Sequence, residues 1–565
     1  MGVFPAATLP QIEAMLCAEN QPFEMEVVDI HGVPTRTWKH LHQNLADLAV
    51  HASGHGDALL HIYADERLSY ENWFRAVAAL AHELRDMGAR PGDRVALAMR
   101  NLPEWSVCFF ATVAIGAISV PVNAWWTGEE LAFALKNSGS SFLIADDDRW
   151  QRTAPHRKSI PGLTQVILAR GERTDGTVRA LEDMIGGPPD YANLPERGLP
   201  DMALTPETRA AIMYTSGTTG KPKGAIISHR NLVTNILSSK WATARAFIRA
   251  GQPLPEPAPK VLLTVIPMFH ATALSAMLMG VLDAGHSMVF MHKWDPVEAF
   301  KLIEREKVNA AGGVPTIAWQ MLEHPDREKY DLSSLESVSY GGAPSAPELV
   351  RRIHEVFGSS PGNGWGMTET TATVTSHSGE DYLHRPESAG PPVPVADLRI
   401  TDPDGNDLPV GTVGELWAKG PQVVEGYWER PEANRETFID GWVRTGDLAR
   451  VDEEGFLFIV DRAKDMLIRG GENIYSSEVE NVLYDHPAVM DAAIVGIPHK
   501  TLGEEPGAVV ALTKGKTAGE DELKAHVRAH LAAFKVPVRI IFHDEMLPRN
   551  ANGKILKNDL KALFS

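Results

Sequence analysis

The segment at residues 214–224, Tyr-Thr-Ser-Gly-Thr-Thr-Gly-Lys-Pro-Lys-Gly, constrains the fold of this chain more than any other. Apolar runs flank it at 210–213 and 224–228, and each run is typical of a buried strand. A loop between two strands that is rich in glycine, hydroxyl groups and lysine suits a phosphate. Glycine lets backbone N–H groups close on the phosphate, hydroxyls donate to its oxygens, and lysines neutralise its charge. The segment therefore predicts a phosphate-binding loop.

This loop is not a Walker A motif. Gly217 and Gly220 are too close together, and Pro222 stands where that motif has Ser or Thr. A flexible Gly/Thr turn is the simpler explanation, but the density of phosphate-binding groups argues against it. The residues expected to contact the phosphates are Thr215, Ser216, Gly217, Thr218, Thr219, Gly220, Lys221 and Lys223.

The composition narrows the class of partner. The 565 residues are 44% hydrophobic and 22% charged, as in an ordinary soluble globular protein. Their net charge of −19 argues against nucleic-acid binding and against attraction to anionic membranes. We therefore expect no nucleic-acid partner, and an anionic substrate must be attracted by local lysines and arginines.

Targeting and cysteine usage predict a cytoplasmic protein. The N-terminus has no basic region followed by an apolar core, so no signal peptide is expected. Residues 106–128 are uncharged and resemble a membrane span, but Pro121 would break a spanning helix. We expect a buried helix and a core strand there, and no integral membrane span. Cys17 and Cys108 lie in no metal-binding or CxxC spacing, which fits a reducing compartment.

Helix and strand patterns organise the chain into three regions. They alternate as far as about residue 380, which predicts an α/β architecture with largely parallel sheets. From about 388 to 450, short alternating runs with glycine and proline predict a small, mostly antiparallel β-subdomain. The remaining C-terminal residues return to helix and strand patterns. Residues 1–35 are expected to be irregular, with a turn at 31–34.

A second chemical motif is Asn-Gly-Trp-Gly-Met-Thr-Glu-Thr at residues 363–370. Trp365 offers an aromatic face to adenine, and Thr368 offers a hydroxyl to the α-phosphate. Glu369 supplies the hard oxygen ligand that Mg²⁺ prefers. A glutamate after a threonine is common, so this motif alone proves little. It supports a nucleotide site only because the same chain also contains the loop at 214–224.

Three single residues carry further candidate chemistry. His270 follows a strand, at the end where α/β proteins bind ligands, although a lone histidine is more often structural. Asp447 suits a vicinal diol or, more simply, caps a turn. Lys554 lies in a Gly-Lys loop, and a solvated basic run is the alternative explanation.

Together these motifs resemble, in order, the adenylate-forming (AMP-binding) superfamily, which includes acyl-CoA synthetases, luciferases and peptide-synthetase adenylation domains. The resemblance points to the branch of acyl-CoA synthetases and fatty-acid–CoA ligases. It implies ATP, Mg²⁺ and coenzyme A as cofactors and co-substrates. It also implies that an acid and ATP form acyl-adenylate and pyrophosphate, after which CoA takes the acyl group and AMP leaves.

The resemblance assigns roles residue by residue. The residues mapped to catalysis are Lys554, Thr368, Glu369 and His270, with Glu369 also the metal ligand. The residues mapped to ATP or AMP beyond the loop are Gly341, Gly342, Ala343, Gly364, Trp365, Gly366, Met367, Asp447 and Arg462. The residues mapped to the acyl pocket are His270, Ala271, Val314, Pro315, Thr316 and Gly341. Lys464 maps to the hinge, and Gly470 and Gly471 map to CoA contacts.

The resemblance also implies the domain plan. It places a large N-terminal domain at 1–460, made of two α/β sheets plus a small β-barrel at about 388–450. A hinge follows at 461–464, and a small mobile α+β C-terminal domain at 465–565 acts as a lid. Rotation about Lys464 would withdraw Lys554 after adenylation and bring the loop at 470–471 to the CoA tunnel.

The acyl substrate and the acceptor are less constrained. Small apolar residues after His270 and at 312–316 favour a medium or long fatty acid or a bulky hydrophobic acid. The pair Phe269-His270 stands where amino-acid-activating members have aspartate, which disfavours an α-amino acid. Alternatives are an enzyme that loads a carrier protein, a luciferase-like oxidase and a non-catalytic nucleotide-binding protein. The sequence leaves open whether the protein forms a homodimer.

Overall fold

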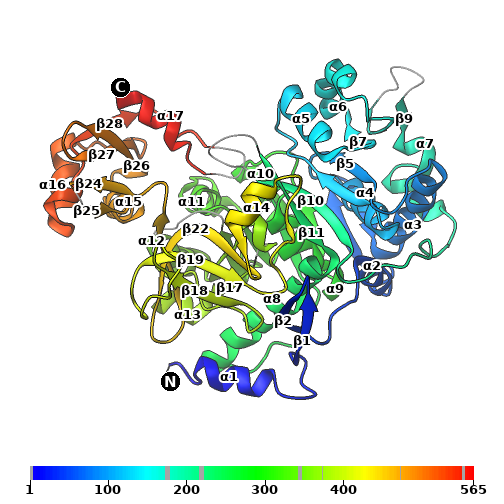
Figure 1. The fold of residues 1–565 in the computed structure, drawn as a ribbon, viewed down its shortest axis with the longest axis horizontal. Coiled ribbons are helices and arrows are strands. Elements are labelled where there is room, and N and C mark those ends of the chain that lie inside the picture. The colour runs from blue at the N-terminus through cyan, green and yellow to red at the C-terminus, as the bar shows by residue number, and fades with distance from the viewer. Residues whose placement is uncertain are drawn as a thin grey trace.

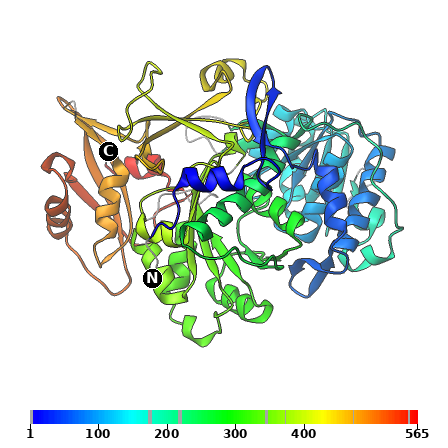
Figure 2. The same ribbon diagram turned by 90° about the horizontal axis from the view of Figure 1, so that it is seen from below.

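The computed structural model of this chain describes residues 4–171, 178–215, 222–341, 347–371, 373–470, 472–549 and 554–564. A large body holds most of the chain, and a smaller C-terminal lobe, coloured orange to red, stands beside it in Figure 1. Figure 2 shows the molecule from below, with the cyan segments at the end opposite the lobe and the dark-blue N-terminal helix between them. The α/β class predicted from the alternation is confirmed.

The first sheet carries the predicted phosphate loop. Among the described residues it has eight strands, parallel except where β10, β11 and β20 pair antiparallel. The strands, in order across the sheet, are β20 (Gly426–Tyr427), β11 (Lys223–Ser228), β10 (Arg209–Thr215), β6 (Ile118–Pro121), β5 (Arg94–Ala98), β7 (Phe142–Asp146), β8 (Gln165–Ala169) and β9 (Val178–Ala180). Its accompanying helices are α3 (Tyr70–Asp86), α4 (Pro103–Ala114), α5 (Gly128–Ser138), α6 (Asp147–Thr153) and α7 (Leu181–Ile185).

The second sheet carries most of the other predicted site segments. Within the described ranges it also has eight strands, with antiparallel pairs only at its two ends. They are β17 (Thr375–Ser378), β16 (Ser360–Trp365), β15 (Ser337–Gly341), β14 (Ala310–Gly313), β12 (Val261–Thr264), β13 (Ser287–Phe290), β3 (Leu59–Tyr63) and β4 (Glu66–Ser69). Its accompanying helices are α2 (Leu45–Ser53), α8 (His229–Arg249), α9 (Met279–Ala284), α10 (Pro296–Glu306), α11 (Pro315–Glu323), α12 (Pro347–Phe357) and α13 (Gly379–His384).

Helices between the two sheets form the largest core. Apolar side chains of α2, α3, α4 and α9 pack there with residues from strands of both sheets. The stretch at 106–128 belongs to this region: α4 is buried along its whole length and β6 follows it, as predicted. In the described part of the chain no helix is long and apolar enough to cross a membrane. Cys17 and Cys108 are both free thiols.

An antiparallel sheet and the C-terminal lobe complete the fold. The antiparallel sheet comprises β18 (Asp397–Thr401), β19 (Gly414–Lys419), β22 (Trp442–Val451), β21 (Phe438–Ile439) and β23 (Leu457–Arg462), and α14 (Pro431–Thr437) lies beside it. The lobe contains β24 (Leu467–Arg469), β25 (Glu472–Ile474), α15 (Ser476–Tyr484), β26 (Val489–His499), β27 (Gly503–Leu512), α16 (Glu520–His530), β28 (Arg539–His543) and α17 (Lys557–Lys561). The lobe has its own apolar core between its sheet and helices.

The N-terminal region is more regular than predicted. Residues 1–35 were expected to be irregular, yet the chain forms α1 (Leu9–Leu16) and a hairpin of β1 (Met25–Ile30) and β2 (Val33–Trp38). The predicted turn lies between the two strands. The helix is stable here because it packs against α8, burying Ile12 and Leu16 in a cluster that a local pattern cannot reveal.

Candidate active site

The described flanks of the phosphate loop agree with the prediction. Thr215 ends β10 and Lys223 begins β11, and the two residues face each other in the antiparallel register. The connection between them is therefore a short link between adjacent strands, as the pattern indicated. Residues 216–221, with the candidates Ser216, Gly217, Thr218, Thr219, Gly220 and Lys221, lie outside the described residues.

Two neighbouring parallel strands of the second sheet, β15 and β16, end together. Gly341 pairs with Gly364 at their carboxyl ends. A Cβ on Gly364 would come within 2.8 Å of the Thr375 carbonyl oxygen, so glycine is needed for the close approach of β17. The candidates Gly342 and Ala343, which follow β15, lie outside the described residues.

The segment after β16 holds Glu369 in a constrained turn. Residues Thr368–Thr370 form a 3₁₀ turn, and Thr371 follows with a φ of 37°, unusual for a β-branched residue. The Thr371 carbonyl accepts hydrogen bonds from Asn235 Nδ2 at 2.8 Å and from Ser275 Oγ at 2.7 Å. Strained conformations of this kind persist where surrounding contacts fix them. These two bonds therefore fix the turn that carries Glu369.

Tyr427 binds the Glu369 carboxylate, a contact the sequence did not predict. The Tyr427 hydroxyl donates to Glu369 Oε1 at 2.6 Å, and the glutamate is only 6% exposed. Burial, reinforced by the charge of Glu369, raises the pKa of Tyr427, so the hydroxyl remains a donor. Lys223 Nζ lies 4.4 Å from the centre of the Tyr427 ring. Tyr427 thus connects the strand after the phosphate loop to the candidate metal ligand.

Asp447 lies at the meeting point of three elements. It lies on β22, directly opposite Arg462 of β23. Arg462 Nε lies 2.5 Å from Asp447 Oδ1, and the Trp365 indole N–H donates to Oδ2 at 2.8 Å. Asp447 is 2% exposed, so both contacts are made away from bulk water. The structure therefore brings Asp447, Arg462 and Trp365 together, and their assignment to the nucleotide stays a prediction.

His270 ends the loop that follows β12. Its backbone N–H donates to the Pro267 carbonyl at 2.9 Å, and its side-chain Nε2 is buried without a hydrogen-bond partner among the described residues. Burial, with a smaller contribution from the positive charge of Lys554, lowers the pKa of His270 to about 4. The imidazole is therefore neutral near pH 7. A buried nitrogen without a protein partner is the kind of group that a ligand can satisfy.

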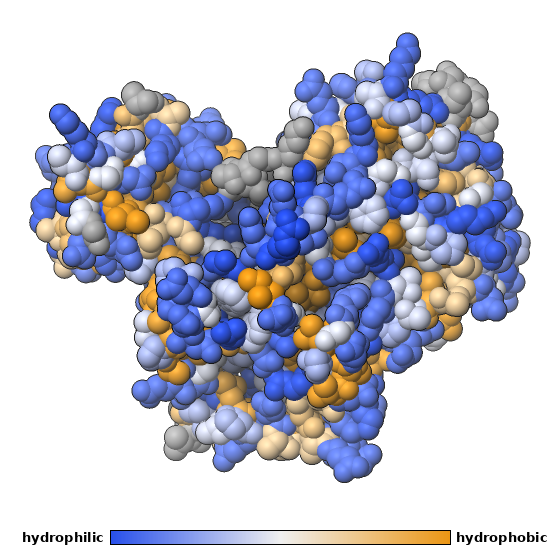
Figure 3. Space-filling model, in the orientation of Figure 1, coloured by the Kyte–Doolittle hydropathy of each residue, from blue (hydrophilic) through white to orange (hydrophobic). Residues whose placement is uncertain are grey.

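Lys554 comes from the C-terminal lobe into the field of the same site. Its side chain is half-buried, and desolvation, together with the positive charge of Arg462, lowers the pKa of Lys554. The carboxylates of Asp447 and Glu369 act in the opposite direction. Figure 3 shows a notch between the lobe and the main body on one face of the molecule. The lobe therefore contributes a cation to a site otherwise built by the main body.

The remaining candidates lie on four separate segments. Ala271 follows His270 and precedes a π-helical turn, Thr272–Leu278, a rare feature that is frequent at functional sites. Val314 lies just before α11, and Pro315 and Thr316 begin that helix. Gly470 adopts a φ of 60° at the tip of the β24–β25 hairpin, where its N–H donates to the Leu502 carbonyl at 2.7 Å. The chain places the candidate Gly366 and Met367 between β16 and the 3₁₀ turn, and Gly471 lies outside the described residues.

Trp365→Phe is expected to weaken ATP binding while leaving the fold intact. The variant keeps an aromatic face but removes the N–H that donates to Asp447. Loss of one hydrogen bond to a charged group costs about 1.5–3 kcal/mol, which corresponds to a rise of roughly 10- to 100-fold in the KM for ATP. Steady-state kinetics at a saturating concentration of the acid substrate will measure this KM. An unchanged KM would show that the indole N–H does not position Asp447.

Comparison with known proteins identifies two family models. The AMP-binding enzyme model matches residues 48–428, and the AMP-binding enzyme C-terminal domain model matches residues 478–554. The first match covers both eight-stranded sheets of the described chain and part of the antiparallel sheet. The second covers most of the C-terminal lobe and ends at Lys554.

Individual relatives match along most of the chain. A feruloyl-CoA synthase from an Amycolatopsis species is 38% identical over 512 residues, covering 91% of this chain and 96% of that protein. A long-chain-fatty-acid–CoA ligase from Bacillus subtilis is 32% identical over 516 residues, covering 88% and 90%. Among solved structures, o-succinylbenzoate CoA synthetase from Bacillus subtilis in complex with ATP and magnesium ion superposes with a TM-score of 0.74. That pair is 30% identical, with 92% of this chain and 99% of the other covered.

Proposed function

Because this chain belongs to the AMP-binding enzyme family and is an acid–thiol ligase of the acyl-CoA synthetase type, we propose that it activates a bulky hydrophobic carboxylic acid. ATP, Mg²⁺ and CoA are its proposed co-substrates and cofactor. The observation that carries the proposal is the convergence of Glu369 and Asp447 from the main body and Arg462 from the proposed hinge with Lys554 from the C-terminal lobe.

In the first half-reaction, a carboxylate oxygen attacks the α-phosphorus of ATP. The new P–O bond forms as the bond between the α-phosphorus and the bridging oxygen breaks, and pyrophosphate leaves with the electron pair. The protein needs to position the reactants and neutralise negative charge rather than form a covalent intermediate. In this proposal Lys554 bridges the carboxylate and α-phosphate, Thr368 donates to the α-phosphate, and Asp447 with Arg462 holds the ribose.

Glu369 fits the role of a magnesium ligand. Its carboxylate is buried, and Oε1 accepts the Tyr427 hydroxyl. Because Oε1 accepts the Tyr427 hydroxyl, Oε2 is the oxygen that we propose for the hard cation. When bound, Mg²⁺ would neutralise charge on the ATP phosphates. Tyr427 would keep the carboxylate oriented toward it.

In the second half-reaction, the CoA thiolate attacks the acyl carbonyl carbon and AMP leaves, which forms the thioester. We propose that the lid rotates at Lys464, so that Lys554 leaves the site and the hairpin at Gly470 and Gly471 approaches CoA. The proposed boundaries are 1–460 for the main domain, with its β-subdomain at about 388–450, 461–464 for the hinge and 465–565 for the lid. This hinge motion would let one site run two reactions.

An aromatic acid is the substrate class that the surroundings of His270 favour. The Trp125 and Phe269 rings meet edge-on with centroids 5.3 Å apart, and Phe269 in turn contacts the His270 ring. Trp125 is 40% exposed, so this aromatic surface is partly open. Flat rings pack well against edges and faces of other rings. The name of the feruloyl-CoA synthase relative agrees with this choice, whereas the fatty-acid ligase relative supports the runner-up, a medium or long fatty acid.

Pyrophosphate release with ATP and Mg²⁺, measured across a panel of acids with and without CoA, tests the proposal. The panel should contain cinnamic, benzoic, and short, medium and long fatty acids. We expect turnover that requires CoA and a kcat/KM at least about tenfold higher for the best aromatic acid than for any fatty acid. A preference for fatty acids would overturn the substrate class alone. A single stoichiometric burst unaffected by CoA would instead indicate that the acyl group is passed to a carrier protein.

A further inference from the structure

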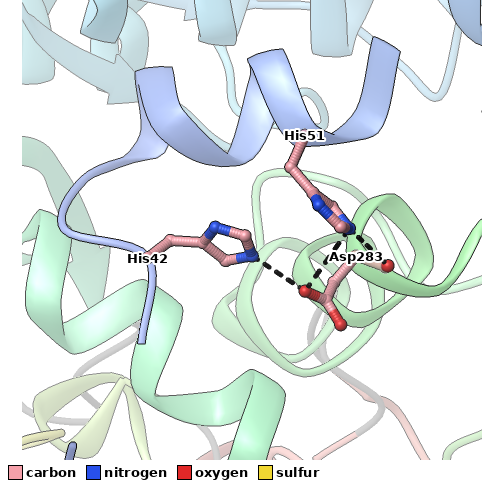
Figure 4. Close-up of side chains that lie close together, drawn as sticks. All are labelled: His42, His51 and Asp283. Atoms are coloured by element: carbon pink, nitrogen blue, oxygen red, sulfur yellow. Dashed lines mark hydrogen bonds and ion pairs between the residues drawn. The ribbon is translucent and has the colours of Figure 1, made fainter. Parts of the chain in front are cut away.

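Away from this site, we propose that His42, His51 and Asp283 form a binding site for a divalent transition-metal ion, with Zn²⁺ the best fit. The three side chains come from the segment before α2, from α2 and from α9, and Figure 4 shows both imidazoles turned toward the same carboxylate. One ligand atom from each lies within 4.8 Å of the other two. The proposal does not depend on the ligase activity.

The spacing of the ligand atoms suits a small tetrahedral ion. His42 Nε2 lies 2.8 Å from Asp283 Oδ1, and His51 Nε2 lies 3.9 Å from the same oxygen. Ligand atoms around a tetrahedral Zn²⁺, with bonds of about 2.0–2.1 Å, lie roughly 3.4 Å apart. The observed distances bracket this value. Small rotations of the exposed His51 ring, which is 47% exposed, would equalise them.

The chemistry of the three groups matches zinc rather than magnesium. Two imidazole nitrogens and one carboxylate oxygen form a mixed N/O set that transition metals bind and that Mg²⁺ avoids. His42 Nε2 now faces Asp283 Oδ1, and His51 Nε2 also lies 3.0 Å from the Asp283 carbonyl oxygen. To bind an ion, each ring carries its proton on Nδ1 and presents the Nε2 lone pair. The ion then replaces the N–H hydrogen that His42 directs at Oδ1 and the one that His51 directs at the Asp283 carbonyl oxygen.

The backbone that carries the ligands is fixed by packing. Four residues of α2 are fully buried in the core between the sheets. Asp283 is only 9% exposed, and its helix α9 continues directly from the π-helical turn after His270. Little ordering is therefore needed when an ion binds. A bound ion would cross-link the N-terminal segment to α9 and so raise the thermal stability of the main body.

The positive charge of Lys240 opposes the binding of a cation at this site. Its ammonium pairs with Asp283 Oδ2, the oxygen that faces away from the imidazoles, and it is 49% exposed. Its positive charge repels a cation, but the side chain can move into solvent without a packing cost.

The neighbouring His55 is a natural control, because its Nε2 faces the Leu282 carbonyl and its ring lies edge-on to Tyr70.

The test is a Zn²⁺ titration of the full, untagged chain by calorimetry, with Co²⁺ as a spectroscopic probe. We expect about one ion per chain, binding that survives millimolar Mg²⁺, a visible absorption spectrum typical of tetrahedral Co²⁺, and a higher Tm with Zn²⁺. His51→Gln and Asp283→Asn should each weaken Zn²⁺ binding at least about tenfold, whereas His55→Gln should leave it unchanged. Lys240→Gln should strengthen it.

Two results would overturn the site. One is a wild-type chain that binds Zn²⁺ with a Kd above about 1 mM. The other is equal Zn²⁺ affinity in the wild type and in His42→Gln/His51→Gln, because the ion would then bind elsewhere. Pyrophosphate release by each variant verifies that it has folded, since none of these residues belongs to the proposed catalytic machinery. An octahedral Co²⁺ spectrum, typical of a loosely bound ion, would also contradict the proposed site. This readout does not depend on whether a variant folds.

Discussion

Lys554→Ala is expected to reduce acyl-adenylate formation about 10²- to 10³-fold, the effect of removing one preorganised charged group from a phosphoryl-transfer site. The side chain is half-buried and lies in the field of Asp447 and Glu369, so the variant removes a positive charge from the site itself. Attack of CoA on supplied acyl-adenylate should fall far less, because the proposed lid rotation withdraws Lys554 before that step. The variant thus separates the two half-reactions.

Two assays measure this separation. Pyrophosphate release reports adenylation, and thioester formation from synthetic acyl-adenylate and CoA reports the second step. Lys561→Ala is the matched control, because Lys561 lies on the same segment, is exposed and pairs with Glu504 at 3.2 Å. The control should keep both activities. Equal losses in both steps for Lys554→Ala would refute its assignment to adenylation alone.

Local motifs made much of the fold and site predictable. The strands on either side of the phosphate loop follow from two apolar runs, and β10 and β11 pair as the pattern indicated. Ser69 caps α3 and Trp73, Val77 and Leu80 line its buried face, because caps and helical periodicity act within a few residues. The positions of Glu369 and Asp447 could likewise be proposed because each lies inside a short motif.

Contacts between distant segments were not predictable from one sequence. Tyr427 is 58 residues from Glu369, and no local pattern marks its hydroxyl as a partner for a buried carboxylate. Asn235 and Ser275 lie in two further segments, yet both bind the Thr371 carbonyl and hold the strained turn. In their local sequence, Asn235 and Ser275 look like ordinary helix positions. Only the fold brings their polar groups to one carbonyl.

The N-terminal hairpin was not predicted from the sequence, for a related reason. Every residue of β1 is intermediate or exposed, so the strand has no buried face to give a clear alternating pattern. Its two-residue turn, His31 and Gly32, has positive φ values of 53° and 84°, typical of a tight hairpin. The turn was recognised, but the strands depend on Trp38 and its neighbours packing against α8. Tertiary packing therefore decided the structure there.

Glu369→Gln is expected to lower kcat/KM for ATP about 10²- to 10³-fold and to raise the Mg²⁺ concentration needed for half-maximal activity. The substitution keeps the size of the side chain and an oxygen that can accept the Tyr427 hydroxyl, but it removes the negative charge that a hard cation requires. The Tm should change by only a few degrees, because the buried hydrogen bond survives.

Tyr427→Phe separates the charge of Glu369 from its orientation. It leaves the carboxylate ionised but removes the 2.6 Å hydrogen bond to Oε1, so a loss of roughly tenfold in kcat/KM is expected. Glu380→Gln, an exposed acidic residue of α13, serves as the matched control and should leave the Mg²⁺ dependence unchanged. Mg²⁺ titrations of pyrophosphate release compare the three variants with the wild type. If Glu369→Gln kept the wild-type Mg²⁺ dependence, the cation would have to be held by other groups, and Tyr427 would be a purely structural partner of the turn.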